Sequence, residues 1–343
     1  MSLENGSQHA AAGKDMAEIS ARVQSYGQNI WMLPGTSVPA TFFGADLKDD
    51  WHALDIALIG IPSDAGLTCR PGARYGPQAV RAQSAFIGYS NPATRVTPYE
   101  LARVGDGGNV PLENALNVEA LVREIEAFYQ EVRRARVIPL SVGGDHSITY
   151  PILKALAAER PVGLIHIDAH FDTYGPLHGV RYHHGTPFYH SIHEGLVDPR
   201  RMVQVALRDP YYEFASLSSL AGVTVLPMHD CQQIGLPEVL SIVRQVIGDG
   251  PVYLSFDIDA LDPAFAPGTG TPVVGGLSTR EALHLLRGLR GLDIIGADVV
   301  EVSPPYDPNG TTALAGAQIL FEELCLAAEA HARRQERSRY ERR

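Results

Sequence analysis

Short apolar runs rich in β-branched residues recur along the chain and predict the strands of a sheet. Several of these runs are apolar almost throughout, as is typical of strands that are covered by helices on both faces. The eight runs lie at residues 54–60, 101–106, 136–142, 162–168, 202–208, 223–227, 252–257 and 293–302.

Helical patterns lie between many of these predicted strands. Apolar residues spaced three and four apart predict an amphipathic helix at residues 117–135. Residues 278–289 begin with Ser278 and Glu281 at the spacing of a capping box, and residues 313–330 are apolar enough for a buried helix. The alternation of strands and helices predicts one α/β domain with a mainly parallel sheet and helices on both faces.

The two ends of the chain depart from this pattern. Residues 1–50 lack strong periodicity and are predicted to be an N-terminal arm that contacts other subunits. Residues 331–343 are basic, and a solvated helix end or a frayed tail is favoured over a contact with nucleic acid.

Polar, ionisable residues follow three of the predicted strands, which is where ligands bind in parallel α/β sheets. The segments SVGGDHS, HIDAHFD and SFDIDALDP end the runs at 136–142, 162–168 and 252–257. Side chains two residues apart point to the same side of an extended backbone. The candidate cluster therefore comprises His146, Asp168, His170, Asp172, Asp257 and Asp259.

Four aspartates packed together would repel one another unless cations lie between them. Four carboxylates and one bridging hydroxide carry a charge of minus five, and two divalent cations supply plus four. The residual minus one matches a substrate with a single positive charge. Carboxylate and imidazole ligands suit Mn²⁺, while Ni²⁺, Co²⁺ and Zn²⁺ remain possible. The pattern predicts a hydrolase that uses two metal ions to activate water.

Three ionisable residues near these motifs are given structural roles instead. His166 is interpreted as a buried core histidine, because it lies deeper in the sheet than Asp168. Asp262 precedes a proline and is interpreted either as a turn residue or as a support for the metal ligands, and Asp145 is interpreted as a support for its neighbour.

The composition of the chain limits the partners and the cellular compartment that can be expected. The formal net charge of -11 argues against a nucleic-acid partner and suits cationic ligands. Cys69, Cys231 and Cys325 are far apart and lack metal-site spacing, as expected in a reducing cytosol. No secretion signal or membrane-length apolar run is recognised, so a cytoplasmic protein without a membrane partner is predicted.

The motifs GGDHS, DAHFD and SFDIDALDP together resemble the ureohydrolases, the arginase/agmatinase family of binuclear-manganese enzymes. The similarity extends to RPGARYGPQAVR, HGTPF, PGTGTPVVGGLS and EVSPPYDPNGTTALAGA, and it spans about residues 55–325. The resemblance implies a three-layer α/β/α fold around an eight-stranded sheet, with the catalytic domain at residues 51–330. It also implies homotrimers or homohexamers.

The resemblance further implies how the candidate ligands divide between two Mn²⁺ ions. Asp168 and Asp257 would bridge the two ions, with the attacking hydroxide between them. One ion would be bound by His146, Asp168, Asp172 and Asp257. The other would be bound by Asp168, His170, Asp257 and Asp259.

His184, Glu301 and Asp172 are the residues that the resemblance assigns to catalysis. His184 in HGTPF matches the histidine that transfers a proton to the leaving amine, although its neighbour His183 remains a rival. Glu301 matches the glutamate that binds the guanidinium through two parallel N–H bonds. The alternative for Glu301 is an ion pair with an arginine such as Arg70 or Arg74.

The loop TYGPLHGVRYHHG at residues 173–185 bears on the substrate. It lacks the Asn and Ser residues with which arginases bind the amino-acid end of arginine, which disfavours arginine as the substrate. It also offers no obvious carboxylate for the second ammonium of agmatine. His178, Arg181 and His183 are suited to bind the carboxylate of guanidinobutyrate or guanidinopropionate, with ordinary loop polarity as the alternative.

Agmatine or a guanidino acid is therefore the expected substrate. Guanidine or a biguanide such as metformin remains open, because the loop departs from both kinds of relative. A non-catalytic subunit paired with an active paralogue is the alternative to an enzyme, and the presence of all six ligands argues against it.

Overall fold

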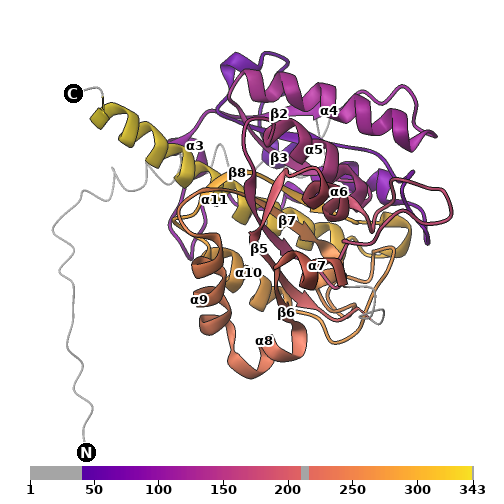
Figure 1. The fold of residues 1–343 in the computed structure, drawn as a ribbon. Helices are drawn as coiled ribbons and strands as arrows, with labels where there is room; N and C mark the ends of the chain where they lie inside the picture. The colour runs from indigo at the N-terminus through magenta and orange to yellow at the C-terminus, as the bar shows by residue number, and fades with distance from the viewer. Residues whose placement is uncertain (1–40, 210–215, 342–343) are drawn as a thin grey trace, which may run out of the picture. The chain divides into compact units, whose positions relative to one another are not determined.

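The computed structural model describes residues 41–209 and 216–341, which belong to a compact unit at Pro39–Arg343. Eight strands in this unit form one sheet with the order β2-β1-β3-β8-β7-β4-β5-β6 (Figure 1). Every pair of neighbouring strands is parallel. The predicted arm at residues 1–50 lies largely outside the described residues.

The predicted apolar runs form the strands, and most are buried along their whole length because helices cover both faces of the sheet. The main difference from prediction is that β5 begins five residues earlier and β2 lies three residues later. The strands are β1 (Ile56–Gly60), β2 (Val104–Asn109), β3 (Ile138–Val142), β4 (Val162–Ile167), β5 (Val197–Leu207), β6 (Thr224–Pro227), β7 (Pro251–Asp257) and β8 (Asp293–Val300).

The displacement of β2 has a packing reason. Leu101 ends the short helix α3 (Pro98–Leu101), so the strand begins only afterwards. The strand contains glycines because its neighbours leave no room for side chains. A Cβ on Gly105 would lie 2.8 Å from Leu54, and one on Gly107 would lie 2.8 Å from Trp51. Glycine-rich segments lack the apolar signal by which a strand is recognised, and the prediction was wrong about these boundaries.

The predicted helices are present, and several shorter ones join them. The helix at residues 278–289 begins with the predicted capping box, in which Ser278 Oγ accepts from the Glu281 amide. This capped helix is α10 (Thr279–Gly288). The other helices longer than six residues in the described part of the chain are α2 (Gly76–Ser84), α4 (Val118–Arg134), α5 (Thr149–Leu156), α6 (Pro187–His193), α8 (Met228–Ile234), α9 (Leu236–Ile247) and α11 (Thr311–Glu341).

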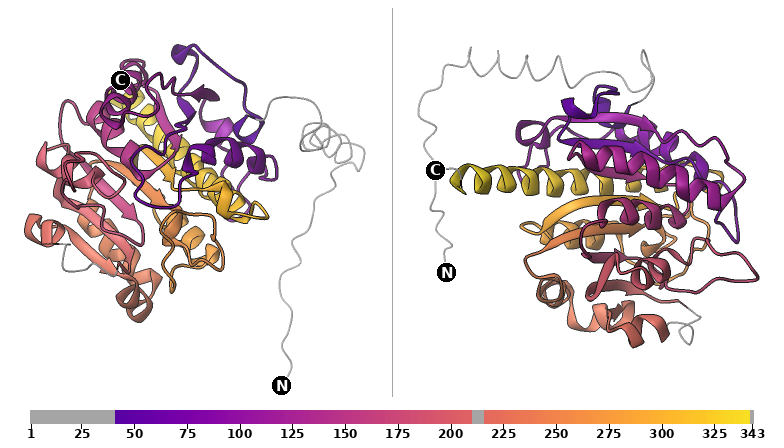
Figure 2. Two further views of the ribbon diagram at one scale, coloured as in Figure 1. Left: turned by 90° about the vertical axis from the view of Figure 1, so that its right-hand side faces the viewer. Right: turned by 45° about the horizontal axis from the view of Figure 1, so that its top comes forward.

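Alternate residues of the strands feed two hydrophobic cores on opposite faces of the sheet. Ile56 and Leu58 of β1 pack in one core, whereas Ala57 and Ile59 pack in the other. Helices α4, α5 and α6 cover the second face, and α2, α9, α10 and α11 cover the first (Figure 2). The predicted three-layer α/β/α architecture is confirmed.

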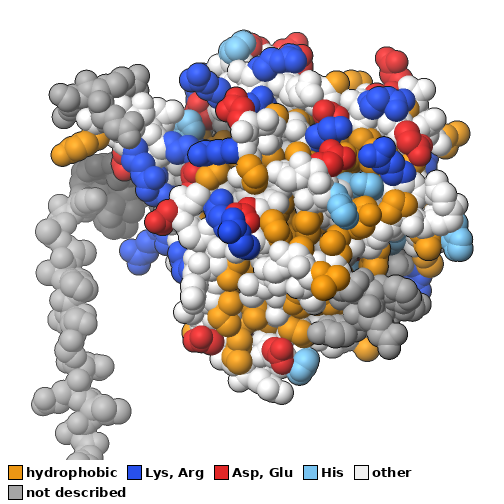
Figure 3. Space-filling view, viewed as in Figure 1, with side chains coloured by type: hydrophobic (Ala, Val, Ile, Leu, Met, Phe, Trp, Pro, Cys, Tyr) orange, Lys and Arg blue, Asp and Glu red, His pale blue; other side chains and the backbone are white. Residues whose placement is uncertain are grey.

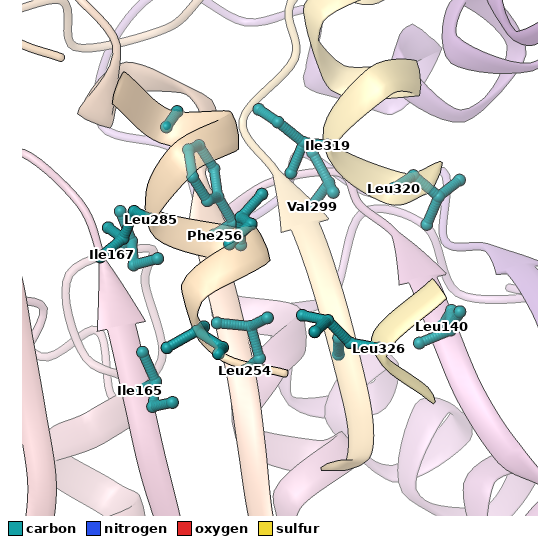
Figure 4. Packing of buried hydrophobic residues seen from close by; sticks show 14 of the residues in the cluster. Leu140, Ile165, Ile167, Leu254, Phe256, Leu285, Val299, Ile319, Leu320 and Leu326 are labelled. Carbon is teal, nitrogen blue, oxygen red and sulfur yellow. The ribbon is translucent and has the colours of Figure 1, made fainter. Parts of the chain in front are cut away.

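Figure 4 shows the first core at close range, where the sheet meets α10 and α11. Leu254 and Phe256 of β7 lie between Ile165 of β4 and Val299 of β8, and all are at most 1% exposed. This packing holds the middle strands firmly, and their carboxyl ends carry the polar motifs.

Helix α11 is both a core element and the carrier of the basic C-terminal segment. By length and composition residues 311–340 are apolar enough to cross a membrane, but 78% of the apolar window is buried inside the protein. That burial is expected of a core helix. The helix continues to Glu341, so most of residues 331–343 form a helix end. The basic side chains of this end are all arginines, and blue side chains lie along it in Figure 3.

Candidate metal centre

The polar motifs meet at the carboxyl edge of the sheet because β3, β8, β7 and β4 are neighbours in that order. Asp145 and Asp257 begin short 3₁₀ turns, where their Oδ1 atoms accept the amides of Ser147 and Asp259 at 2.9 and 2.8 Å. Gly144 is required in the first motif, because a Cβ there would lie 2.2 Å from the Ser63 carbonyl oxygen. The motifs therefore place their carboxylates and imidazoles on one edge.

A first group of ligand atoms surrounds the imidazole of His146. Its Nδ1 atom lies 2.8 Å from Asp172 Oδ2 and 3.2 Å from both Asp168 Oδ2 and Asp257 Oδ2. All four side chains are buried, yet His146 Nδ1 makes no hydrogen bond of acceptable geometry. A buried lone pair facing three carboxylate oxygens suits a cation.

A second group adjoins the first and shares Asp168 with it. His170 Nδ1 lies 3.0 Å from Asp259 Oδ2 and 3.5 Å from Asp168 Oδ1. Asp168 thus presents Oδ2 to the first group and Oδ1 to the second. The structure brings the six predicted ligands together in these two groups. Asp257 adjoins both groups, because its Oδ2 lies beside His146 and its Oδ1 accepts the backbone amide of Asp259.

The electrostatics of the cluster favour bound cations. Burial raises the pKa of Asp257 well above its usual range, and the neighbouring Asp259 and Asp168 raise it further. Burial also raises the pKa of Asp259, partly opposed by His170. Carboxyl groups with such raised pKa values release their protons readily only when positive charge is supplied. The donor set therefore fits a pair of divalent cations.

A buried hydrogen-bonded chain behind His146 determines which of its nitrogens faces the carboxylates. Ser255 Oγ donates to Asp298 Oδ1 at 2.6 Å and lies 2.9 Å from His146 Nε2. Since the serine proton is used, His146 Nε2 donates to Ser255, which leaves Nδ1 free to bind a metal. Asp298 also accepts from Thr149 and Tyr253 at 2.7 and 2.8 Å. Sequence reasoning missed this chain, because single polar residues inside apolar strands carry no motif.

Glu301 follows β8 and reaches the same edge. Its Oε1 accepts the amide of His146 at 2.8 Å, whereas its Oε2 is buried without a partner. The alternative ion pair is absent, because Arg74 pairs with Asp64 and Arg70 lies over the ring of Tyr306 at 5.3 Å.

Backbone strain marks two of these positions. Glu301 and Asp172 have φ angles of 65° and 50°, which are uncommon for residues other than glycine. Strained backbone of this kind concentrates at functional sites.

His184 lies between Glu301 and a residue that the sequence analysis missed, Thr68. Its Nδ1 is 3.4 Å from Glu301 Oε1, and its Nε2 is 2.8 Å from Thr68 Oγ1. Burial opposes protonation of His184, but the carboxylate of Glu301 outweighs it and raises the pKa to about 9. The imidazole thus holds a proton beside the metal ligands.

Arg208 is a second residue beside the site that the sequence analysis missed, because it belongs to no recognisable motif. It follows β5, and its guanidinium donates to the carbonyl oxygens of Asp259, Ala260 and Val273. Burial lowers its pKa, while Asp259 and Asp168 oppose that change. Arg208 therefore ties the segment that carries Asp259 to the end of β5.

The structure does not bring the three predicted tail-binding residues together. His183 is buried, with one ring nitrogen 3.3 Å from the Gly175 carbonyl and the other accepting the Gly185 amide. The Arg181 guanidinium lies 3.8 Å from Glu194. His178 is exposed and lies, with a φ of 49°, in a two-residue turn at residues 177–180.

The interpretation of Asp262 as a turn residue is confirmed, because it accepts the amides of residues 264, 275 and 276.

A parallel sheet whose strand ends gather buried imidazoles and carboxylates into two adjoining groups defines a metal-dependent α/β enzyme. Comparison with known protein families identifies the family to which this enzyme belongs. The arginase family model matches residues 54–325, and the chain belongs to that family. The family is characterised by a binuclear metal centre, with which the two groups of ligands agree.

Individual relatives cover most of the chain. Guanidinopropionase of Pseudomonas aeruginosa is 49% identical over 296 residues, which is 85% of this chain and 93% of the relative. The mitochondrial agmatinase of Gallus gallus is 47% identical over 278 residues, 80% of this chain and 82% of the relative. The solved structure of proclavaminate amidinohydrolase from Streptomyces clavuligerus has a TM-score of 0.83 at 38% identity and covers 86% of this chain and 99% of its own. The resemblance that the motifs predicted is confirmed.

Proposed function

We propose that this protein is a metal-dependent ureohydrolase, which splits a guanidino compound into urea and an amine. The observation that carries the proposal is the unpartnered, buried Oε2 of Glu301 beside the two groups of metal ligands. A buried carboxylate oxygen without a donor is costly, and a guanidinium N–H satisfies it. The activities named for the relatives belong to the same class of reaction.

Four aspartates and two histidines would hold the metal pair. When bound, two divalent cations would lower the pKa of a water molecule towards neutrality and so supply the nucleophile. Mn²⁺ is proposed, with Ni²⁺ as the main alternative, because mixed carboxylate and imidazole ligands accept both. The proposed ligands are His146, Asp168, Asp172, Asp257 for one ion and Asp168, His170, Asp257, Asp259 for the other.

The protein's own residues orient the substrate and move the proton. Glu301 would bind the guanidinium through its unpartnered Oε2 and so orient the substrate beside the ligand cluster. The hydroxyl of Thr68 holds His184 at Nε2, and Nδ1 faces Glu301. With a pKa raised to about 9, His184 carries a proton at neutral pH and transfers it to the departing amine.

The proposed substrate is a guanidino acid or agmatine, with arginine disfavoured. The named relatives include both kinds, a guanidinopropionase and an agmatinase. Of the predicted tail-binding residues, only His178 has a side chain without an internal partner among the described residues. A homotrimer or homohexamer in the cytoplasm is proposed as its working form.

The test is urea release by the purified full-length chain, loaded in turn with Mn²⁺ and Ni²⁺. The substrate panel comprises agmatine, guanidinobutyrate, guanidinopropionate, arginine, guanidine and metformin. Glu301→Gln is expected to lower kcat/KM by about 100-fold or more, since the charged bidentate partner is lost. The control is Glu238→Gln, an exposed glutamate on α9 that should leave urea release unchanged.

Urea from none of these compounds, in a chain that binds two metals per subunit, would refute the proposed activity. It would then favour the alternative of a non-catalytic subunit that works beside an active paralogue.

A further inference from the structure

His166 on β4 contributes an imidazole to the same group of potential ligands as His146. It is fully buried, and its Nε2 lies 2.6 Å from Asp168 Oδ2 while its Nδ1 lies 3.0 Å from Gln204 Nε2. A histidine nitrogen binds a metal through its lone pair and loses that ability when it carries a proton. The location of the ring proton therefore decides what His166 does.

The orientation of the Gln204 amide locates that proton. Gln204 Nε2 lies 2.6 Å from the carbonyl oxygen of Phe171, which accepts hydrogen bonds and never donates them. Gln204 Oε1 accepts from Ser218 Oγ at 2.8 Å. The opposite orientation would place two carbonyl oxygens against each other, so the amino group of Gln204 faces Phe171 and His166.

The tautomer of His166 follows from this orientation. An amide NH₂ only donates, so His166 Nδ1 must accept from it. The proton of the neutral ring then lies on Nε2, which donates to Asp168 Oδ2. A protonated Nε2 has no lone pair for a metal, so His166 is excluded as a ligand.

Asp168 gains a matched pair of hydrogen bonds from this arrangement. Its Oδ2 accepts from the His166 ring, and its Oδ1 accepts the backbone amide of His170 at 2.6 Å. One donor on each oxygen leaves each with a lone pair to spare. Oδ2 faces His146 and Oδ1 faces the His170 ring, so each oxygen is available to a different ion.

We propose that His166 is a positioning residue, which orients the shared carboxylate of Asp168 between two metal ions, and that Gln204 fixes its tautomer. The proposal rests on the two-metal centre of the proposed function and extends it to residues behind the ligands. Hydrogen-bond partners of this kind commonly change metal affinity by about 10–100-fold when they are removed.

The side-chain amide of Gln204 also links the candidate metal centre to helix α7 (Ser216–Ala221), which lies farther from the ligands. Ser218, on α7, contacts both Gln204 and the hydroxyl of Thr173 at 3.0 Å. Thr173 and Phe171 flank Asp172, so the network also holds the strained backbone of that ligand.

The test compares the metal affinity of the full-length chain with that of three variants. Mn²⁺ affinity is measured by competition with a chelator, and the coupling of the ion pair by electron paramagnetic resonance. His166→Phe keeps the ring and removes the donor, and a loss of about 10–100-fold in affinity with weakened coupling is expected. His166→Gln returns an N–H donor close to the Nε2 position and should restore most of both. His190→Phe, which replaces a buried imidazole on α6 outside the cluster, is the matched control.

The outcomes separate a positioning residue from a ligand. Wild-type affinity in His166→Phe would overturn the proposal, because the donor would then have no role. Equal loss in His166→Gln and His166→Phe would also overturn it and make His166 a ligand. If far-UV circular dichroism shows that His166→Phe does not fold, Gln204→Met takes its place, and unchanged affinity there refutes the proposal. None of these readouts depends on urea release, so the proposed activity fails or succeeds separately.

Discussion

At the scale of single residues, the site combines groups that would repel each other if they were merely packed together. Asp168, Asp257 and Asp259 are all at most 3% exposed, and their carboxylates lie around two imidazoles. Such an arrangement is stable only where each charge has a partner. Each ligand should therefore matter for metal binding more than for folding.

Asp259→Ala tests this distinction. The change removes one ligand of the second group without emptying the hydrophobic core, so urea release is expected to fall by more than about 100-fold and metal content to drop towards one ion per chain. Far-UV circular dichroism should match the unmodified protein. Asp249→Ala, at an exposed aspartate, is the control for removing a carboxylate. A melted spectrum for Asp259→Ala would contradict the prediction.

His184 gives a prediction about pH. Its pKa is raised from an ordinary 6.5 to about 9 in the folded protein, so protonation stabilises the fold. That stabilisation is complete below about pH 6.5 and is lost as the pH rises through 9, by roughly 3 kcal/mol at most.

Denaturant unfolding of the metal-free protein at pH 6, 8 and 10 measures this effect against His184→Asn. The difference in unfolding free energy between the two proteins should shrink as the pH rises. A difference that stays constant across this range would show that Glu301 does not hold the proton on His184.

At the scale of elements, the strand ends position the chemistry and the helices hold the strands in place. Helix α10 illustrates how local sequence secures this, because Ser278 and Glu281 satisfy each other's amides at its first turn. The capped helix packs its buried face, including Leu285, against the sheet (Figure 4).

Ser278→Ala is expected to lower the unfolding free energy by about 1 kcal/mol, since the first-turn amide of Glu281 loses its acceptor. Chemical denaturation measures it, and metal affinity should remain unchanged because the helix start is not among the ligands. Thr279→Ala, one position later, keeps the cap and serves as the control. If Thr279→Ala lowered the unfolding free energy as much as Ser278→Ala does, the cap would contribute nothing.

A second prediction at this scale concerns the packing under the site. Leu254→Ala on β7 removes a fully buried side chain from between β4 and β8, and a loss of about 2–5 kcal/mol in unfolding free energy is expected. Denaturation of the metal-loaded protein gives the value. A change below 1 kcal/mol would mean that the core closes over the gap.

At the scale of the whole molecule, metal binding and folding are coupled, because the cluster is assembled only in the folded chain. Its members come from segments as far apart as residues 146 and 259. Removing the metal with a chelator should lower the unfolding free energy by about 2.7 kcal/mol for each ion lost, relative to protein held at 100 times the dissociation constant.

Thermal unfolding with and without Mn²⁺ makes the comparison, and adding the metal back should restore the transition. Mg²⁺ at the same ionic strength is the control for non-specific screening, since it prefers an all-oxygen shell. An identical transition in the three conditions would contradict a metal site made from these residues.

Several features were determined by local sequence alone. The apolar runs predict the parallel strands because strands covered on both faces need apolar residues throughout, and β1, β3 and β4 follow that rule. The identity of the six candidate ligands was also readable, because period-two spacing at a strand end places side chains on one side of the backbone.

Other features were decided only by the tertiary structure, because they depend on residues that are distant in sequence. The tautomer of His166 depends on Gln204, 38 residues later, and the free nitrogen of His146 depends on Ser255, 109 residues later. Whether His183 and Arg181 are available to a substrate depends on their partners in the folded protein, the Gly175 carbonyl oxygen and the Glu194 carboxylate. Sequence patterns record what one strand or helix requires, whereas a hydrogen bond between strands is fixed only when the sheet brings its donor and acceptor together.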